Sequence, residues 1–159
     1  MRITLITVGK IKESYLTQAV EEYAKRLSRY VQLNIEEVAD EKTADQMSET
    51  EIRQVLEKEG RRIEAKIPER AWVAALAIEG KMYSSEGLAA KLQERMVGGD
   101  SHLVLIIGGS LGLSEQVLRR SHARISFSPM TFPHQLMRVI ALEQIYRSFR
   151  ILNHEPYHK

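Results

Sequence analysis

The sequence predicts an α/β fold with a mostly parallel sheet and helices on both faces. Strand-like and helix-like patterns alternate along the whole chain, which is typical of that fold class. The runs Trp72–Ile78 and His102–Ile107 are almost continuously apolar, as expected for strands covered on both faces. A glycine-rich loop, Gly108–Gly112, follows the second run, where open parallel sheets bind ligands. The 159 residues suffice for one core, so we expect a single domain over 1–159.

The first three elements follow from their periodicity. Arg2–Val8 is β-branched and apolar and stops at Gly9, which predicts a strand. Gln32–Val38 alternates apolar and polar residues and predicts a half-buried strand. Between them, apolar residues recur at helical spacing and define one buried face: Leu16, Ala19, Val20, Tyr23, Ala24 and Leu27.

Capping signals predict where the next helices begin. Ser48 and Glu51 have the spacing of a capping box, and the helix that follows would contain Gly60 as a weak point. Ser84 or Ser85 can cap the helix after Trp72–Ile78, and Ser114 can start a short one. Arg124–Phe127 predicts a last short strand. Pro133 fits the first position of a long final helix that reaches about Leu152.

Composition excludes several classes of protein. The chain has no cysteine, which excludes disulfides and thiolate metal sites. The apolar start is short and is soon followed by Lys10 and Lys12, unlike a signal peptide. No stretch approaches the roughly 18 apolar residues of a membrane span. We therefore expect a cytoplasmic protein with no metal and no membrane partner.

The charge is unevenly distributed. Residues 119–159 hold seven Lys and Arg against two Glu, a balance of +5, together with four of the five histidines. The first 118 residues hold 16 basic and 19 acidic residues, a balance of −3. Such asymmetry indicates an end that faces a polyanion, although arginines that merely solvate helices would produce it equally well.

Two loops are candidates for ligand binding. Gly108–Gly112 permits close backbone approach, but it matches neither a dinucleotide fingerprint nor a P-loop, and a simple tight turn is an equal alternative. Phe127–His134 holds two prolines and two phenylalanines between a strand and a helix. It could clamp an aromatic base, although taken alone the loop favours ordinary core packing of Phe127 and Phe132 together with a helix start set by proline.

The final helix and the tail are further candidates. The helix is apolar on nearly every face, which predicts burial all round and favours a dimer interface over a central core helix. Arg138, Arg147 and Arg150 would otherwise need partners or solvent. The tail, Asn153–Lys159, carries Tyr and His side chains that suit RNA binding or proton transfer, while disorder is the ordinary expectation for a chain end.

The two loops, their order and the tail together resemble one family. The segments IIGGS and SFSPMTFPHQLMRV and the terminal Pro-Tyr-His-Lys are similar to those of the bacterial large-subunit rRNA pseudouridine N3-methyltransferases, a family of the knotted SPOUT superfamily. The resemblance covers the whole chain, from Ile3-Thr4-Leu5 to the last residue, and includes the Glu-Tyr-x-Lys-Arg-Leu pattern at Glu22–Leu27.

That resemblance implies a trefoil knot within about residues 103–155, an exception among folds. It also implies S-adenosylmethionine as cofactor, a homodimer, and methylation of N3 of a pseudouridine in a 23S rRNA stem-loop of the assembled ribosome. Carried over by position, the cofactor contacts would be Leu76, Gly108, Phe127, Ser128, Pro129, Met130, Thr131 and Phe132.

The reaction would be direct displacement of the methyl group by N3, whose proton must be accepted or whose anion must be stabilised. Candidate catalytic residues are His134, Arg138, Glu143 and His158. Arg138 would stabilise negative charge, and the sequence does not identify which of the other three is the base. Candidate RNA contacts are Arg138, Arg147, Arg150, His154, Tyr157, His158 and Lys159. Two other functions stay open: a non-catalytic ribosome-binding factor, and a small-molecule enzyme that uses another nucleotide.

Overall fold

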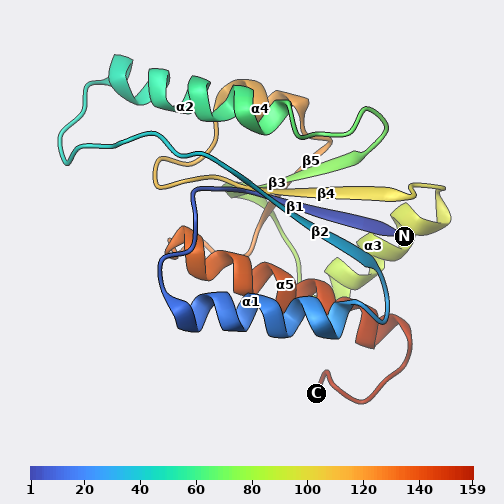
Figure 1. Ribbon diagram of the computed structural model, residues 1–159. Helices are drawn as coiled ribbons and strands as arrows, with labels where there is room; N and C mark the ends of the chain where they lie inside the picture. The colour runs from blue at the N-terminus through green and yellow to red at the C-terminus, as the bar shows by residue number, and fades with distance from the viewer.

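A computed structural model describes residues 1–159 as a three-layer α/β structure (Figure 1). Five strands form one sheet in the order β2-β1-β4-β3-β5, and every pairing is parallel. Helices α2 and α4 cover one face, and α1, α3 and α5 cover the other (Figure 1). The elements are β1 (Arg2–Val8), α1 (Ser14–Leu27), β2 (Gln32–Val38), α2 (Glu49–Glu64), β3 (Trp72–Met82), α3 (Ser85–Val97), β4 (His102–Ile107), α4 (Glu115–Arg120), β5 (Ala123–Ser126) and α5 (His134–Leu152).

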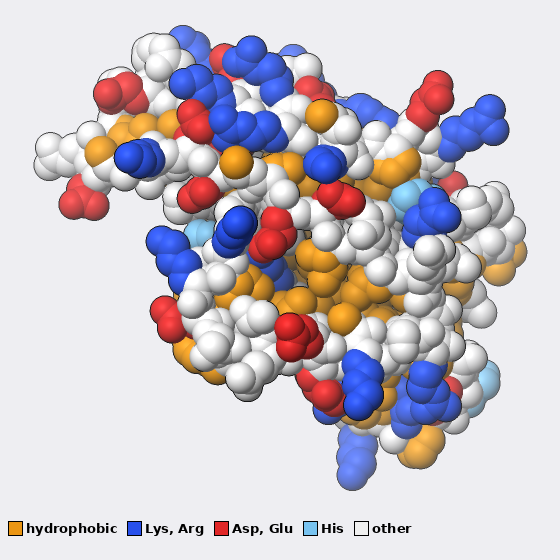
Figure 2. Space-filling model, viewed as in Figure 1, with side chains coloured by type: hydrophobic (Ala, Val, Ile, Leu, Met, Phe, Trp, Pro, Cys, Tyr) orange, Lys and Arg blue, Asp and Glu red, His pale blue; other side chains and the backbone are white.

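Strand alternation gives the sheet two apolar cores. Ile3 and Leu5 of β1 pack toward α1 and α5, where Leu142 and Phe149 are buried. Ile6 and Val8 point the other way, into the core beneath α2 and α4. This double burial is the reason that β1 and β4 are apolar at nearly every position. On the face shown in Figure 2, charged side chains of both signs cover the helices, and apolar ones gather between the two helical layers.

Most predicted caps are confirmed. Ser48 and Glu51 form the reciprocal capping box, and Ser84 and Ser114 each accept a backbone N–H three residues on. Pro133 is the N-cap of α5 rather than its first helical residue, a difference of one position. The last strand likewise begins one residue earlier than predicted, at Ala123, and ends at Ser126.

Two predictions need correction. Gly60 is no weak point: it is buried, and a Cβ there would lie 2.6 Å from the Oγ of Ser114, so the glycine lets α2 and α4 approach closely. The strand predicted over Trp72–Ile78 continues to Met82, because its pairing with β5 breaks after Leu76 and resumes at Lys81. Such an irregularity releases the residues between from the ladder and re-aims their side chains.

No helix of this chain has both the length and the apolar character needed to cross a membrane.

Candidate active site

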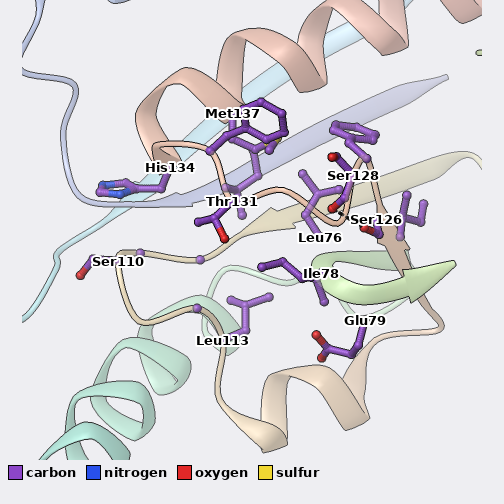
Figure 3. Close-up of a pocket in the computed structure, with 18 of the residues that line it drawn as sticks. Leu76, Ile78, Glu79, Ser110, Leu113, Ser126, Ser128, Thr131, His134 and Met137 are labelled. Carbon is purple, nitrogen blue, oxygen red and sulfur yellow. Dashed lines mark hydrogen bonds between the residues drawn. The ribbon is translucent and has the colours of Figure 1, made fainter. Parts of the chain in front are cut away.

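A pocket of ≈ 690 Å³ lies at the carboxyl ends of β3, β4 and β5 (Figure 3). Three chain segments converge on it: the end of β3, the glycine loop after β4, and the loop between β5 and α5. The volume lies within the range of pockets that bind cofactors, and the lining is mostly apolar with a few polar groups. This is the edge of a parallel sheet where ligands are expected.

The glycine loop has no room for a side chain at its first residue. A Cβ on Gly108 would lie 2.4 Å from the carbonyl oxygen of Gly112. Gly112 itself has φ +88°, and its N–H donates to the carbonyl of Gly109 at 3.1 Å. The loop is therefore a closed turn that brings bare backbone to the pocket wall.

The second loop is held in shape by its own serines. The hydroxyl of Ser126 donates to the carbonyl of Ser128 at 3.0 Å, and the Ser128 hydroxyl accepts the N–H of Met130 at 3.0 Å. Figure 3 shows Thr131 with its hydroxyl directed into the pocket. Met130 lines the same pocket and is 72% exposed, so the pocket is open at this side.

The end of β3 forms the third wall. Leu76, Ile78 and Glu79 line the pocket, and Figure 3 shows the Glu79 carboxylate at its lower rim. A Cβ on Gly80 would lie 2.6 Å from the backbone of Ile125, so this glycine lets β3 press against β5. Ile78 and Glu79 were not predicted to line a pocket, although a glycine inside a strand signals such a close approach.

Seven of the eight residues predicted to contact a cofactor line this one pocket: Leu76, Gly108, Phe127, Ser128, Met130, Thr131 and Phe132. Pro129 does not line it and is exposed. The structure thus brings together residues that are far apart in the sequence.

His134 is the only one of the four candidate catalytic residues that lines the pocket (Figure 3). Burial lowers the pKa of its imidazole below the ordinary value, and the nearby Arg138 lowers it further, against an opposing effect of Asp40. The ring is therefore neutral near pH 7 and can accept a proton.

Arg138 lies in the protein interior and only 2% of it is exposed. Its guanidinium donates to the carbonyls of Val8 and Gly9 at 2.9 and 2.8 Å and pairs with Glu37 at 2.7 Å. It therefore ties α5 to the ends of β1 and β2, beside the pocket but outside its lining.

Glu143 and His158 lie away from the pocket. Glu143 bonds to Arg147 and to the hydroxyl of Tyr157, each at 2.8 Å. His158 uses both ring nitrogens, one with Glu86 at 2.7 Å and one with Arg147 at 3.2 Å. Each group is engaged within the chain.

The tail is folded back onto α5 and also contacts α3 and the turn after α1. The ring of Tyr157 packs edge-on against that of Tyr146, with centroids 5.0 Å apart, and Arg147 lies over the same ring. Glu155 accepts the hydroxyl of Tyr30 at 2.7 Å. Disorder, the ordinary expectation for a chain end, is thus wrong for most of this tail, because its side chains find partners on α5, on α3 and in the turn after α1. His154 and Lys159 are exposed.

The arginines of α5 do not support the dimer argument that the sequence suggested. Arg138, Arg147 and Arg150 all have carboxylate partners in the same chain. A short apolar stretch of α5 is not fully covered by the rest of the chain: Leu136 is 37% exposed, and Val139 and Ile140 are half-buried.

A buried carboxyl group behind the glycine loop was not predicted. Glu59 of α2 is almost completely buried and accepts the N–H of Glu41 at 3.0 Å. Its other oxygen lies 3.3 Å from the point where a Cβ on Gly109 would be. Burial raises the pKa of Glu59 above its ordinary value, although the hydrogen bond from the N–H of Glu41 opposes this shift. Its helical position among charged residues gave no signal of burial.

Comparisons with known proteins agree with this geometry. The model of a family described as predicted SPOUT methyltransferase matches residues 1–158. The chain is 57% identical to ribosomal RNA large subunit methyltransferase H of Listeria monocytogenes serovar 1/2a and 59% identical to that of Bifidobacterium adolescentis, over 159 residues and all of each protein. A solved structure of a probable methylase family protein from Haemophilus influenzae matches with a TM-score of 0.53 at 12% identity, over 99% of this chain and 70% of the other, and supports the fold alone.

Proposed function

This chain belongs to the SPOUT methyltransferase family, and we propose that it transfers a methyl group from S-adenosylmethionine to N3 of a pseudouridine in 23S rRNA of the assembled ribosome. The observation that supports this most directly is the convergence of three strand ends on one pocket that includes the glycine loop. Relatives of equal length that are named as rRNA methyltransferases support the substrate class. A ribosomal substrate implies a cytoplasmic protein.

The pocket fits the proposed cofactor. The bare backbone of the glycine loop and the serine-bonded loop 126–130 offer backbone groups to a nucleoside. Leu76, Phe127 and Phe132 add apolar surface for its base. Bound S-adenosylmethionine would supply a methyl group on a sulfonium, which is already a strong leaving group. The task of the protein is therefore mainly to position two reactants.

His134 is the candidate base that the geometry favours. It lines the pocket, its depressed pKa keeps it neutral near pH 7, and no hydrogen bond within the chain occupies its ring. Glu143 and His158 are engaged with Arg147 and other groups. Arg138 would act by holding α5 and lowering the pKa of His134, because both terminal nitrogens of its guanidinium bond to Glu37 and two carbonyls and its Nε is buried.

We propose a homodimer because the tail is held away from the pocket within its own chain. Tyr157 bonds to Glu143 in the middle of α5, and His158 bonds to Glu86 and Arg147. Neither Tyr157 nor His158 lines the pocket around His134 at the start of the helix. A second copy packed on the exposed apolar side of α5 could present its tail there. The knot within about residues 103–155 stays a prediction of family membership.

The decisive experiment is methyl transfer from labelled S-adenosylmethionine to ribosomes from cells that lack this protein, with free 23S rRNA in parallel. We expect label at N3 of a single pseudouridine, mapped by digestion and mass spectrometry, in ribosomes rather than free RNA. Transfer to another atom or RNA would refute the substrate. A thermal shift with S-adenosylmethionine and S-adenosylhomocysteine, but not with NAD or ATP, tests the cofactor separately.

Mixed dimers test the use of two chains at one site. One variant would carry Gly108→Ala to disable the pocket, and the other would lack Tyr157–Lys159. If pocket and tail come from different subunits, half of the dimers in an equal mixture have one intact site, which restores about a quarter of wild-type activity. No recovery in a mixture shown to exchange subunits would refute the arrangement.

A further inference from the structure

A second hollow lies at the amino-terminal edge of the sheet, opposite the pocket. It has a volume of ≈ 400 Å³ and is lined by Met1, Arg2, Gln32, Pro68, Arg70, Ser101 and His102. The starts of neighbouring strands form its floor, because Arg2 lies in register with both Gln32 and His102. In Figure 1 this is the end of the sheet marked by the N-terminus.

The hollow is positively charged. Arg2 and Arg70 line it, no carboxylate does, and neither arginine forms an ion pair. The Nε of Arg2 donates to the side-chain oxygen of Gln32 at 3.4 Å, which leaves both terminal nitrogens of its guanidinium without a partner in the chain. By contrast, Arg138, Arg147 and Arg150 of α5 each form an ion pair with a carboxylate of the same chain.

Neutral polar groups complete the lining. A ring nitrogen of His102 lies 2.8 Å from the hydroxyl of Thr4, which is buried, so the ring is held in place. Burial lowers the pKa of His102 and the charge of Arg2 lowers it further, so the ring is neutral near pH 7. Ser101 adds a hydroxyl beside it. Two forked cations with neutral hydrogen-bonding groups and no competing anion suit an oxyanion with several acceptor atoms.

The location favours a nucleic acid as the source of that anion. The turn that precedes Gln32 contains Tyr30, whose hydroxyl holds Glu155 of the folded tail. The hollow and the start of the tail therefore lie near the same end of the molecule, where the chain leaves α5 and turns back below it in Figure 1. A polyanion that contacts the tail can continue along this edge.

We propose that the hollow between Arg2 and Arg70 binds a backbone phosphate of the RNA substrate, at a distance from the methyl-transfer pocket. The identity of the RNA rests on the proposed function, but the phosphate chemistry does not. The site anchors the protein on RNA and contributes no group to the reaction. It adds a sequence-independent, salt-sensitive contact of the kind that positions a protein on nucleic acid.

The test compares Arg2→Gln/Arg70→Gln with the matched pair Arg53→Gln/Arg61→Gln. The control removes the same charge from exposed arginines of α2 that form no ion pair. Binding to ribosomes and to 23S rRNA would be measured from 50 to 300 mM salt, roughly the range over which phosphate contacts weaken. For each phosphate lost, we expect the salt slope to fall by about 0.7–0.9 and affinity at 0.1 M salt to fall roughly five- to eightfold. The control should keep the wild-type slope.

S-adenosylmethionine affinity should be equal in all three proteins, which verifies folding and reports separately on the proposed enzyme. Wild-type protein that binds RNA but transfers no methyl group would refute the proposed function and leave the phosphate site standing. The site itself is refuted if the hollow variant keeps the wild-type slope, if both pairs lose affinity equally, or if wild-type protein does not bind RNA. Competition by polyglutamate as strong as that by RNA would instead indicate an acidic protein partner and refute the phosphate assignment.

Discussion

Replacement of Arg138 by alanine should destabilise the fold before it affects any chemistry. The buried guanidinium satisfies the carbonyls of Val8 and Gly9, and each would be left without a donor at a cost of about 1–3 kcal/mol. Glu37 is 40% exposed and its carboxylate can be rehydrated, so the loss of its ion pair with Arg138 adds at most about 1 kcal/mol. We expect a total of roughly 3–5 kcal/mol, the usual cost of removing one partner of a buried ion pair.

The assay is urea unfolding followed by far-UV circular dichroism at one fixed protein concentration. For a chain of this length, a loss of that size lowers the melting temperature by roughly 10 °C. Arg119→Ala is the control, because Arg119 is 76% exposed and pairs with Glu115 on the surface of α4, so it should cost less than about 1 kcal/mol. Arg138→Lys, which keeps the charge with fewer donors, should lie between.

A free energy of unfolding for Arg138→Ala within about 1 kcal/mol of the wild-type value, as expected for a surface ion pair, would refute a structural role for the buried guanidinium. Its methyl-transfer activity is informative only at a temperature where the variant is shown to be folded. At such a temperature, loss of activity with cofactor affinity intact would support a role for Arg138 in setting the pKa of His134.

Three further changes test other parts of the site. Gly108→Ala should weaken S-adenosylmethionine binding roughly tenfold or more, as measured by calorimetry. The Cβ of the new alanine would lie 2.4 Å from the carbonyl oxygen of Gly112 and must displace the loop. An affinity equal to that of wild type would contradict this. Glu59→Gln should raise the free energy of unfolding at pH 7–8 but hardly at pH 4. The pKa of Glu59 is raised in the folded state, so the ionised carboxylate destabilises the fold at neutral pH, whereas at pH 4 the group is protonated and resembles the glutamine. Equal effects at both pH values would count against this reasoning. Tyr157→Phe removes a 2.8 Å hydrogen bond to Glu143 and should cost about 1 kcal/mol while speeding amide hydrogen exchange over residues 153–159; unchanged exchange would show that the bond does not hold the tail.

The predictions from sequence succeeded where local pattern determines structure. Continuous apolar runs located β3 and β4, and helical spacing located α1, because burial on two faces or on one stripe leaves a direct periodic signal. The loops at the carboxyl ends of the strands could be chosen as ligand sites because a parallel sheet places all such ends on one edge.

Features that depend on distant contacts were not predictable in this way. Arg138 finds Glu37, 101 residues earlier in the chain, and nothing in the local pattern of α5 indicates this partner. Glu59 lies among charged residues in the sequence, yet it is buried beside Gly109 and the segment that contains Glu41, which are distant in the chain. The tail is ordered by Tyr30 and Tyr146, whereas composition alone favours fraying.

The strand order has a consequence for how the chain is synthesised. β1 lies between β2 and β4, so one of its edges waits for residues 102–107, which are made about 100 residues after β1 itself. At typical elongation rates of 5–20 residues per second, that edge stays open for roughly 5–20 s. Over that interval the nascent chain presents an apolar strand, Ile3 to Val8, with unpaired backbone groups, which is a template for aggregation. The growing chain is therefore most prone to edge-to-edge association before β4 is made and closes the sheet.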